Sequence, residues 1–151
     1  MSARDRLAEL GLTLPAVVPP IATYVPAVRT GSLVFTSGQL PLVDGALAVT
    51  GKVGAGVSPE QAKELAATCA LNALAAVDAL VGLESVVRVV KVVGFVASTP
   101  DFTGQPGVVN GASELLGAVL GDAGVHARSA VGVAALPLDA PVEVEVVVEV
   151  S

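Results

Sequence analysis

The sequence has few of the residues that metal sites and nucleic-acid surfaces need. Its 151 residues include no tryptophan, one cysteine (Cys69) and one histidine (His126). One cysteine excludes an internal disulfide, and a single cysteine with a single histidine is too few for a usual zinc site. The chain has eight lysines and arginines, none in a run, against 14 acidic residues. A basic surface that binds nucleic acid is therefore not expected.

Charged residues of both signs are scarce. They make up 15% of the chain, whereas hydrophobic residues make up 53%. A chain with this much apolar surface to bury is expected to fold. Its length fits one domain over residues 1–151, with residues 1–20 as an N-terminal extension. Because little polar material is left to cover a monomer, part of the surface is expected to lie against other subunits.

The most apolar window, residues 65–83, is nearly long enough to cross a membrane. It contains Thr68, Asn72 and Asp78, and a carboxylate at the centre of a membrane helix costs about 2.5–3.5 kcal/mol. We therefore expect a buried helix and no membrane partner. The first ten residues lack an apolar core of signal-peptide length, which predicts a cytoplasmic protein.

Helix, arm and strand signals follow one another in the N-terminal third. Residues 4–10 predict a short polar helix, and four prolines up to Pro26 predict an extended arm after it. Residues 29–37 then form a predicted strand. The Asp44-Gly45 pair predicts that a hairpin follows.

Two helices and three strands are predicted in the remainder. Ser58 as N-cap, with Gln61 at the capping-box position, predicts a helix over residues 59–81. A second helix is expected over residues 107–120. Runs rich in β-branched residues predict strands at 86–98, 128–136 and 142–150.

The order of these elements is two strands, helix, strand, helix and two strands. It predicts an α+β fold with both helices on one face of a single sheet. In the last strand, valines alternate with Glu143 and Glu145, so these glutamates would lie on the other face. They are too polar for a core and too close to apolar neighbours to be simply solvated. A subunit interface that encloses a polar cleft would satisfy both conditions.

Familiar catalytic motifs are weak. The glycine-rich residues 51–56 lack a Walker or dinucleotide-binding spacing, which favours a flexible connector. A serine hydrolase would need Ser37 or Ser129 beside His126, but no G-x-S-x-G elbow occurs. His126 is better explained as a residue that leads into the next strand.

Arg128 begins a predicted strand whose other residues are small or apolar. Its guanidinium cannot lose its charge, so it needs an anion. One interpretation is a structural pair with Glu143 or Glu145 on a neighbouring strand. The other is a fork that binds a substrate carboxylate through two parallel hydrogen bonds. Residue chemistry alone leaves both open.

Several short segments occur in order along the chain. They are Tyr24, residues 36–41 (TSGQLP), Asn110, residues 126–129 (HARS), residues 133–137 (VAALP) and residues 142–145 (VEVE). Together they resemble the Rid family, the reactive-intermediate deaminases that are also called YjgF-like or endoribonuclease L-PSP. The resemblance runs from Pro20 to the C-terminus, and residues 11–15 (GLTLP) are similar to a longer-chain branch of this family.

This resemblance implies a chorismate-mutase-like α+β domain with a mixed sheet, assembled as a homotrimer with clefts between subunits. It implies hydrolysis of 2-imino acids, formed from enamines such as 2-aminoacrylate, to 2-keto acids and ammonia, without cofactor or metal. By position, Arg128 would bind the substrate carboxylate, and Glu143 would assist the attacking water or the proton transfers. Gly38 would offer backbone contacts near the imine. The residues that would shape the pocket are Ser37, Tyr24 and Asn110.

Four features depart from the family pattern. Ala130 stands where many relatives have cysteine, His126 where proline is frequent and Ser113 where an aromatic residue is common, and residues 101–109 carry an insertion. These differences predict a pocket that admits something larger than the smallest imino acids.

Other roles are open for single residues and for the whole protein. Tyr24 also suits a hydrogen bond at a strand end, Asn110 a helix cap and Ser37 a turn. Cys69 is expected in the core. The alternatives to the deaminase are a non-catalytic trimer that binds small carboxylates, a deaminase of a bulkier catabolic enamine, and a ribonuclease, which the acidic charge disfavours.

Overall fold

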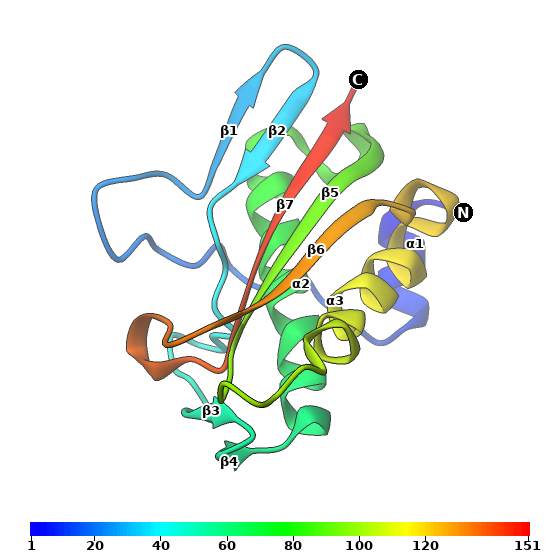
Figure 1. Cartoon of the computed structure of the whole chain (residues 1–151). Coiled ribbons are helices and arrows are strands. Elements are labelled where there is room, and N and C mark those ends of the chain that lie inside the picture. Colours follow the sequence, from blue (N-terminus) through cyan, green and yellow to red (C-terminus); the bar gives the residue numbers. More distant parts are fainter.

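A computed structural model describes residues 1–151 and places the helices on one face of a five-stranded sheet (Figure 1). The strand order is β1-β2-β7-β5-β6. β5 and β6 run parallel, and the other neighbouring strands are antiparallel. The predicted α+β class, with a mixed sheet and helices on one face, is confirmed.

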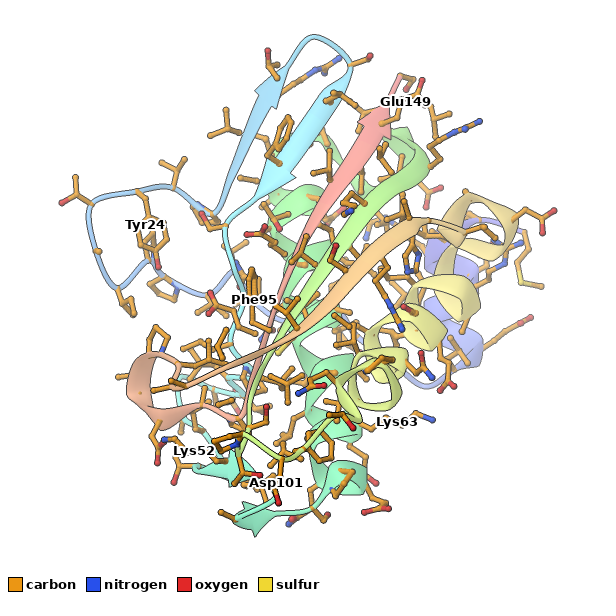
Figure 2. The ribbon with its side chains drawn as sticks, viewed as in Figure 1. Tyr24, Lys52, Lys63, Phe95, Asp101 and Glu149 are labelled. Carbon is orange, nitrogen blue, oxygen red and sulfur yellow. The ribbon has the colours of Figure 1, made fainter.

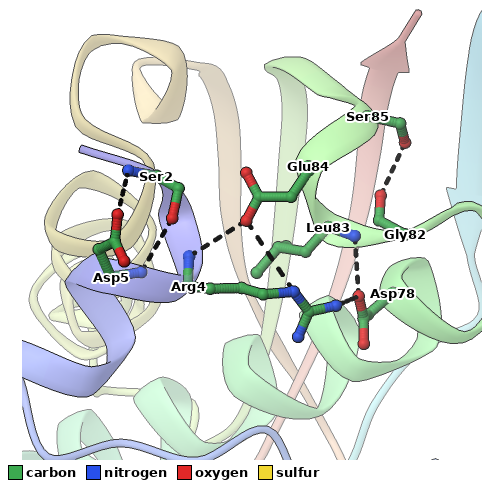
Figure 3. Close-up of polar contacts among 8 residues, drawn as sticks. All are labelled: Ser2, Arg4, Asp5, Asp78, Gly82, Leu83, Glu84 and Ser85. Carbon is green, nitrogen blue, oxygen red and sulfur yellow. Dashed lines mark hydrogen bonds and ion pairs between the residues drawn. The ribbon is translucent and has the colours of Figure 1, made fainter.

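The chain begins with α1 (Ala3–Glu9), close to the predicted helix at residues 4–10. Arg4 forms an ion pair with Asp78 at 2.5 Å, and its backbone N–H donates a hydrogen bond to Glu84 (Figure 3). These contacts hold α1 against the end of the long central helix. The proline-rich arm that follows has no helix or strand before Pro26, as predicted.

The strand predicted at residues 29–37 is a hairpin of two strands, β1 (Ala27–Thr30) and β2 (Leu33–Thr36). Gly31 makes the turn with a φ of 58°, a conformation that glycine adopts without steric cost. β2 pairs with β7 (Val142–Val150), which joins the hairpin to the sheet.

The hairpin predicted around Asp44-Gly45 is present only as a tight turn. Both turn residues have positive φ, and the two flanking residues exchange backbone hydrogen bonds, but no longer ladder forms. Residues 51–56 were expected as a flexible connector, but two short parallel strands overlap them. These are β3 (Lys52–Val53) and β4 (Gly56–Val57).

Helix α2 (Pro59–Val81) has the predicted bounds and the predicted capping box. By length and composition it is apolar enough to cross a membrane, but it packs against the sheet and α3 (Gln105–Leu120), as a core helix does. α3 begins two residues earlier than predicted. Gly111 allows the two helices to approach closely, because a Cβ there would overlap the carbonyl oxygen of Lys63.

Three strands complete the sheet: β7, β5 (Val86–Ala97) and β6 (Ala127–Val133), which ends three residues earlier than predicted. Along β7 the valines at alternate positions are buried under the helices, and the glutamates face the other side, as predicted. That open face also carries an apolar side chain from each of the five strands. They are Val28, Phe35, Phe95 (labelled in Figure 2), Val131 and Val147. The remaining short helices are η1 (Leu83–Ser85), η2 (Gly121–Gly124) and η3 (Pro137–Asp139).

Candidate functional site

Arg128 lies near the start of β6, at the edge of the sheet, and its guanidinium packs against α3. Nη1 donates hydrogen bonds to Asn110 Oδ1 at 2.7 Å and to Ser113 Oγ at 3.1 Å, and Nη2 donates to the carbonyl oxygen of Pro106 at 3.4 Å. Arg128 forms no ion pair. A guanidinium has five N–H bonds, so the Nε–H and one N–H of Nη2 have no partner in the chain.

His126 extends this network from the residue just before β6. Its Nε2 lies 2.9 Å from Ser113 Oγ, and its Nδ1 lies 2.6 Å from the carbonyl oxygen of Gly124. His126 leads into the strand, as expected, and is hydrogen-bonded to neither Ser37 nor Ser129. From the sequence, Ser113 was noted only as a departure from a family pattern, and His126 as a departure and as a residue that leads into the strand. Nothing in their spacing shows that the two residues touch.

Glu143 lies at the start of β7, on the open face of the sheet. Gln39 exchanges two backbone hydrogen bonds with Val144, at 2.8 and 3.1 Å, which brings Gly38 against Glu143. A Cβ on Gly38 would lie 2.8 Å from Glu143 Cδ, so only glycine allows this approach. The Gly38 N–H makes no hydrogen bond within the chain. Burial, followed by the charge of Glu145, raises the pKa of Glu143 above its ordinary value.

The proline-rich arm closes one side of Glu143. Tyr24, Gly38 and Glu143 line a pocket of about 60 Å³ together with four prolines. The Tyr24 hydroxyl accepts a hydrogen bond from the Ile21 N–H, inside the arm and not at a strand end (Figure 2). The Ser37 hydroxyl donates to a backbone carbonyl of the arm at 2.6 Å and so ties the arm to the end of β2.

The predicted site residues therefore form two separate groups within one chain. The arginine group is Arg128 with Asn110, Ser113 and His126, and the glutamate group is Glu143 with Tyr24, Ser37 and Gly38.

Strand register shows how far apart these groups are. Arg128 pairs with Val92 of β5, whereas Glu143 pairs with Phe95 on the other side of the same strand. The two residues are thus about 10 Å apart across the sheet and about 10 Å apart along it. Val92 is fully buried under the helices, and Phe95 lies three residues further on, facing the open side. Arg128 and Glu143 consequently lie on opposite faces of the sheet.

Two interpretations from the sequence are wrong. The neighbour of β6 is β5, not β7, so Arg128 forms no structural pair with Glu143 or Glu145. Asn110 does not cap the second helix. It lies inside α3, where its side-chain oxygen accepts a hydrogen bond from Arg128.

Neither a metal site nor a reactive cysteine is present outside these two groups. No three His, Cys, Asp or Glu side chains lie close enough together to hold a metal ion. Cys69 is fully buried in the core, as predicted, and this burial raises the pKa of its thiol well above the ordinary value. The Cys69 thiol is therefore protonated and inert in the folded chain.

Comparisons with known proteins agree with this fold. The sequence model of the family described as Endoribonuclease L-PSP matches residues 15–150. Protein TCP17 of Trypanosoma cruzi is 44% identical over 147 residues, which cover 96% of this chain and 92% of that protein.

Two solved structures are also similar. The crystal structure of Atu1372 from Agrobacterium tumefaciens, a protein of unknown function, is 48% identical with a TM-score of 0.92, covering 99% of this chain and 92% of that one. The crystal structure of E. coli TdcF with bound serine is 26% identical with a TM-score of 0.63, covering 92% of this chain and 96% of that one.

Proposed function

Because the chain belongs to the endoribonuclease L-PSP family, whose members are also called YjgF-like or Rid proteins, we propose that it hydrolyses 2-imino acids to 2-keto acids and ammonia. The observation that carries this proposal is the environment of Arg128. The Arg128 guanidinium donates hydrogen bonds only to neutral groups, and two of its N–H donors have no partner in the chain.

A half-buried guanidinium without a carboxylate partner suits an anionic ligand. Two free N–H donors on one arginine match the two oxygens of a carboxylate, and such charge-assisted pairs are stronger than neutral hydrogen bonds. The serine bound to TdcF carries this carboxylate. Arg128 would thus recognise the acid group that every 2-imino acid has.

Glu143 supplies the proton transfers that the reaction needs. Water adds to the carbon of the C=N bond, and the C–N bond then breaks to release ammonia and leave a C=O group. Glu143 would take a proton from the attacking water and pass it to the nitrogen. It would then pass the hydroxyl proton of the resulting carbinolamine to the same nitrogen as the C–N bond breaks, so that both water protons leave with ammonia. A carboxyl with a raised pKa suits both steps. The free Gly38 N–H beside it would donate a hydrogen bond to the substrate.

The two groups meet only if another copy of the chain takes part. Arg128 and Glu143 lie on opposite faces of one chain's sheet, and the open face that carries Glu143 presents exposed apolar side chains such as Phe35 and Val131. The edge of one copy packed on the open face of the next would bury these side chains and join the groups. Repeated head-to-tail, this contact closes into a ring. We propose the homotrimer that the family resemblance implies, with one site at each interface.

The first test measures the reaction directly. An amino-acid oxidase generates the imino acid in place, and the wild-type protein should accelerate 2-keto acid formation. Arg128→Ala should lower kcat/KM by at least about 100-fold, because it removes a charge-assisted bidentate contact. Arg29→Ala is the matched control, since Arg29 is exposed, hydrogen-bonds only to main-chain oxygens and pairs with Val34, whose side chain lies on the helix side of the sheet. A wild-type protein that gives no acceleration refutes the enzyme proposal.

A mixing experiment tests the shared site. Arg128→Ala and Glu143→Gln are each expected to be inactive, but subunits of the two variants, unfolded together and refolded as a mixture, form some interfaces with both native residues. Random trimers with one site at each interface would recover about a quarter of wild-type activity. A site within one chain would recover none, and that result would refute the interfacial site.

A further inference from the structure

We propose that His126 and Ser113 are positioning residues that orient the Arg128 guanidinium for carboxylate binding. The inference rests on the proposed function. It starts from one continuous chain of hydrogen bonds, in which Arg128 Nη1 contacts Ser113 Oγ at 3.1 Å and Ser113 Oγ contacts His126 Nε2 at 2.9 Å. His126 Nδ1 ends the chain at the carbonyl oxygen of Gly124, at 2.6 Å.

The two ends of this chain fix the direction of two of its hydrogen bonds. Arg128 can only donate, so Ser113 Oγ accepts from it. The Gly124 carbonyl can only accept, so His126 Nδ1 carries a proton and donates. In this proposal the Ser113 hydroxyl donates to His126 Nε2, an arrangement that requires the imidazole tautomer with its proton on Nδ1.

The hydrogen bonds to α3 fix the orientation of the Arg128 guanidinium plane. Both hydrogens of Nη1 are taken, by Ser113 and by Asn110, and Nη2 donates to Pro106. All three acceptors lie on α3 at positions that share one side of the helix. The Nε–H and the second Nη2 hydrogen are consequently the two donors left for a ligand.

His126 matters because a serine hydroxyl inside a helix has another acceptor within reach. Without a partner beyond it, Ser113 can turn its hydroxyl toward the backbone carbonyl one turn earlier in α3. When His126 accepts the hydroxyl hydrogen of Ser113, a lone pair of Ser113 Oγ stays directed at the Arg128 guanidinium. His126 thus acts through Ser113 and contacts no substrate.

Affinity for pyruvate, a small 2-keto acid, tests the proposal in the intact protein. Ser113→Ala and His126→Ala should each raise the pyruvate Kd about tenfold, as expected for one weakened hydrogen bond to a charged group. His126→Gln, whose side-chain oxygen can accept from Ser113, should stay within about twofold of wild type. The matched control is Val125→Ala, because Val125 adjoins His126 but is 77% exposed.

A double variant separates positioning from independent contacts. If His126 acts only through Ser113, Ser113→Ala with His126→Ala binds pyruvate as Ser113→Ala alone does. Effects that multiply would overturn the proposal, and so would single variants that bind like wild type. Melting temperatures identify any variant that fails to fold.

A second readout needs no ligand. The chain has one histidine, so the imidazole ¹⁵N NMR signals belong to His126 without further assignment. The proposal expects the tautomer protonated at Nδ1 in the wild type. In Ser113→Ala it expects the Nε2 signal to change as its hydrogen bond is lost, while Nδ1 stays protonated because the Gly124 carbonyl still accepts from it. An Nε2-protonated wild type would overturn the proposal. A wild type with the expected tautomer that neither binds pyruvate nor hydrolyses imines would instead refute the proposed function.

Discussion

Gly38→Ala tests whether the position of the Glu143 carboxylate controls the reaction. The added Cβ would lie 2.8 Å from Glu143 Cδ and closer still to Oε1, whereas ordinary contact begins at 3.4 Å. The carboxylate must therefore retreat by about 1 Å or more. A reacting group misplaced by about 1 Å can lower the rate about 100-fold.

The fold should tolerate the same change. The atoms that must move are the end of a flexible side chain on a half-buried residue, and Gly38 has no positive φ that alanine would strain. We expect kcat to fall about 100-fold while the free energy of unfolding changes by less than about 1 kcal/mol. Imine hydrolysis and urea denaturation measure the two quantities on the same sample.

Gly117→Ala is the matched control. Gly117 lies in α3, and nothing lies within 4 Å of a Cβ added there. Alanine in a helix should stabilise the protein by up to about 1 kcal/mol and leave kcat unchanged. If Gly38→Ala folds normally and keeps most of the wild-type kcat, the carboxylate position does not limit the reaction, and Glu143 does not have the proposed role.

Two further predictions concern stability. Asn72 is buried, and its Nδ2 donates hydrogen bonds to the carbonyls of Leu40 and Leu42, both at 3.0 Å, so Asn72→Ala should lower the free energy of unfolding by about 2–3 kcal/mol. A urea-measured change below about 0.5 kcal/mol would contradict the importance of this link. The raised pKa of Glu143 means that its contribution to stability is fully present below the unfolded pKa and is lost as pH rises through the folded pKa. Glu143→Gln should therefore be more stable than wild type at pH 7 and about equally stable near pH 4, and an equal difference at both pH values would disprove the assigned cause.

Much of the fold follows from local signals. The start of α2 was predicted because a capping box is complete within four residues, and its end because Gly82 is the first helix breaker after it. The face of β7 was predicted because side chains alternate along any strand. The hairpin of β1 and β2 was missed because one glycine turn interrupts an otherwise continuous strand pattern. The short ladder of β3 and β4 was missed because two-residue strands leave no periodic signal.

The candidate site could be predicted as a set of residues but not as a geometry. Arg128, Glu143 and Gly38 were identified from motifs, yet motif order says nothing about which strands lie side by side. Ser113 and His126 were noted in the sequence as departures from the family pattern. Their contact could not be predicted, because it joins α3 to the residue before β6. Only packing of the helix on the sheet edge brings them together.

The sequence by itself determined where the long helices and strands lie, which face of β7 is apolar, and that Arg128 has no carboxylate near it along the chain. These properties depend on hydrogen bonds and side-chain directions within a few residues. The tertiary structure alone decided that β5 separates β6 from β7, so that Arg128 and Glu143 lie on opposite faces of the sheet. Strand order depends on the packing of residues far apart in the chain, which local periodicity does not encode.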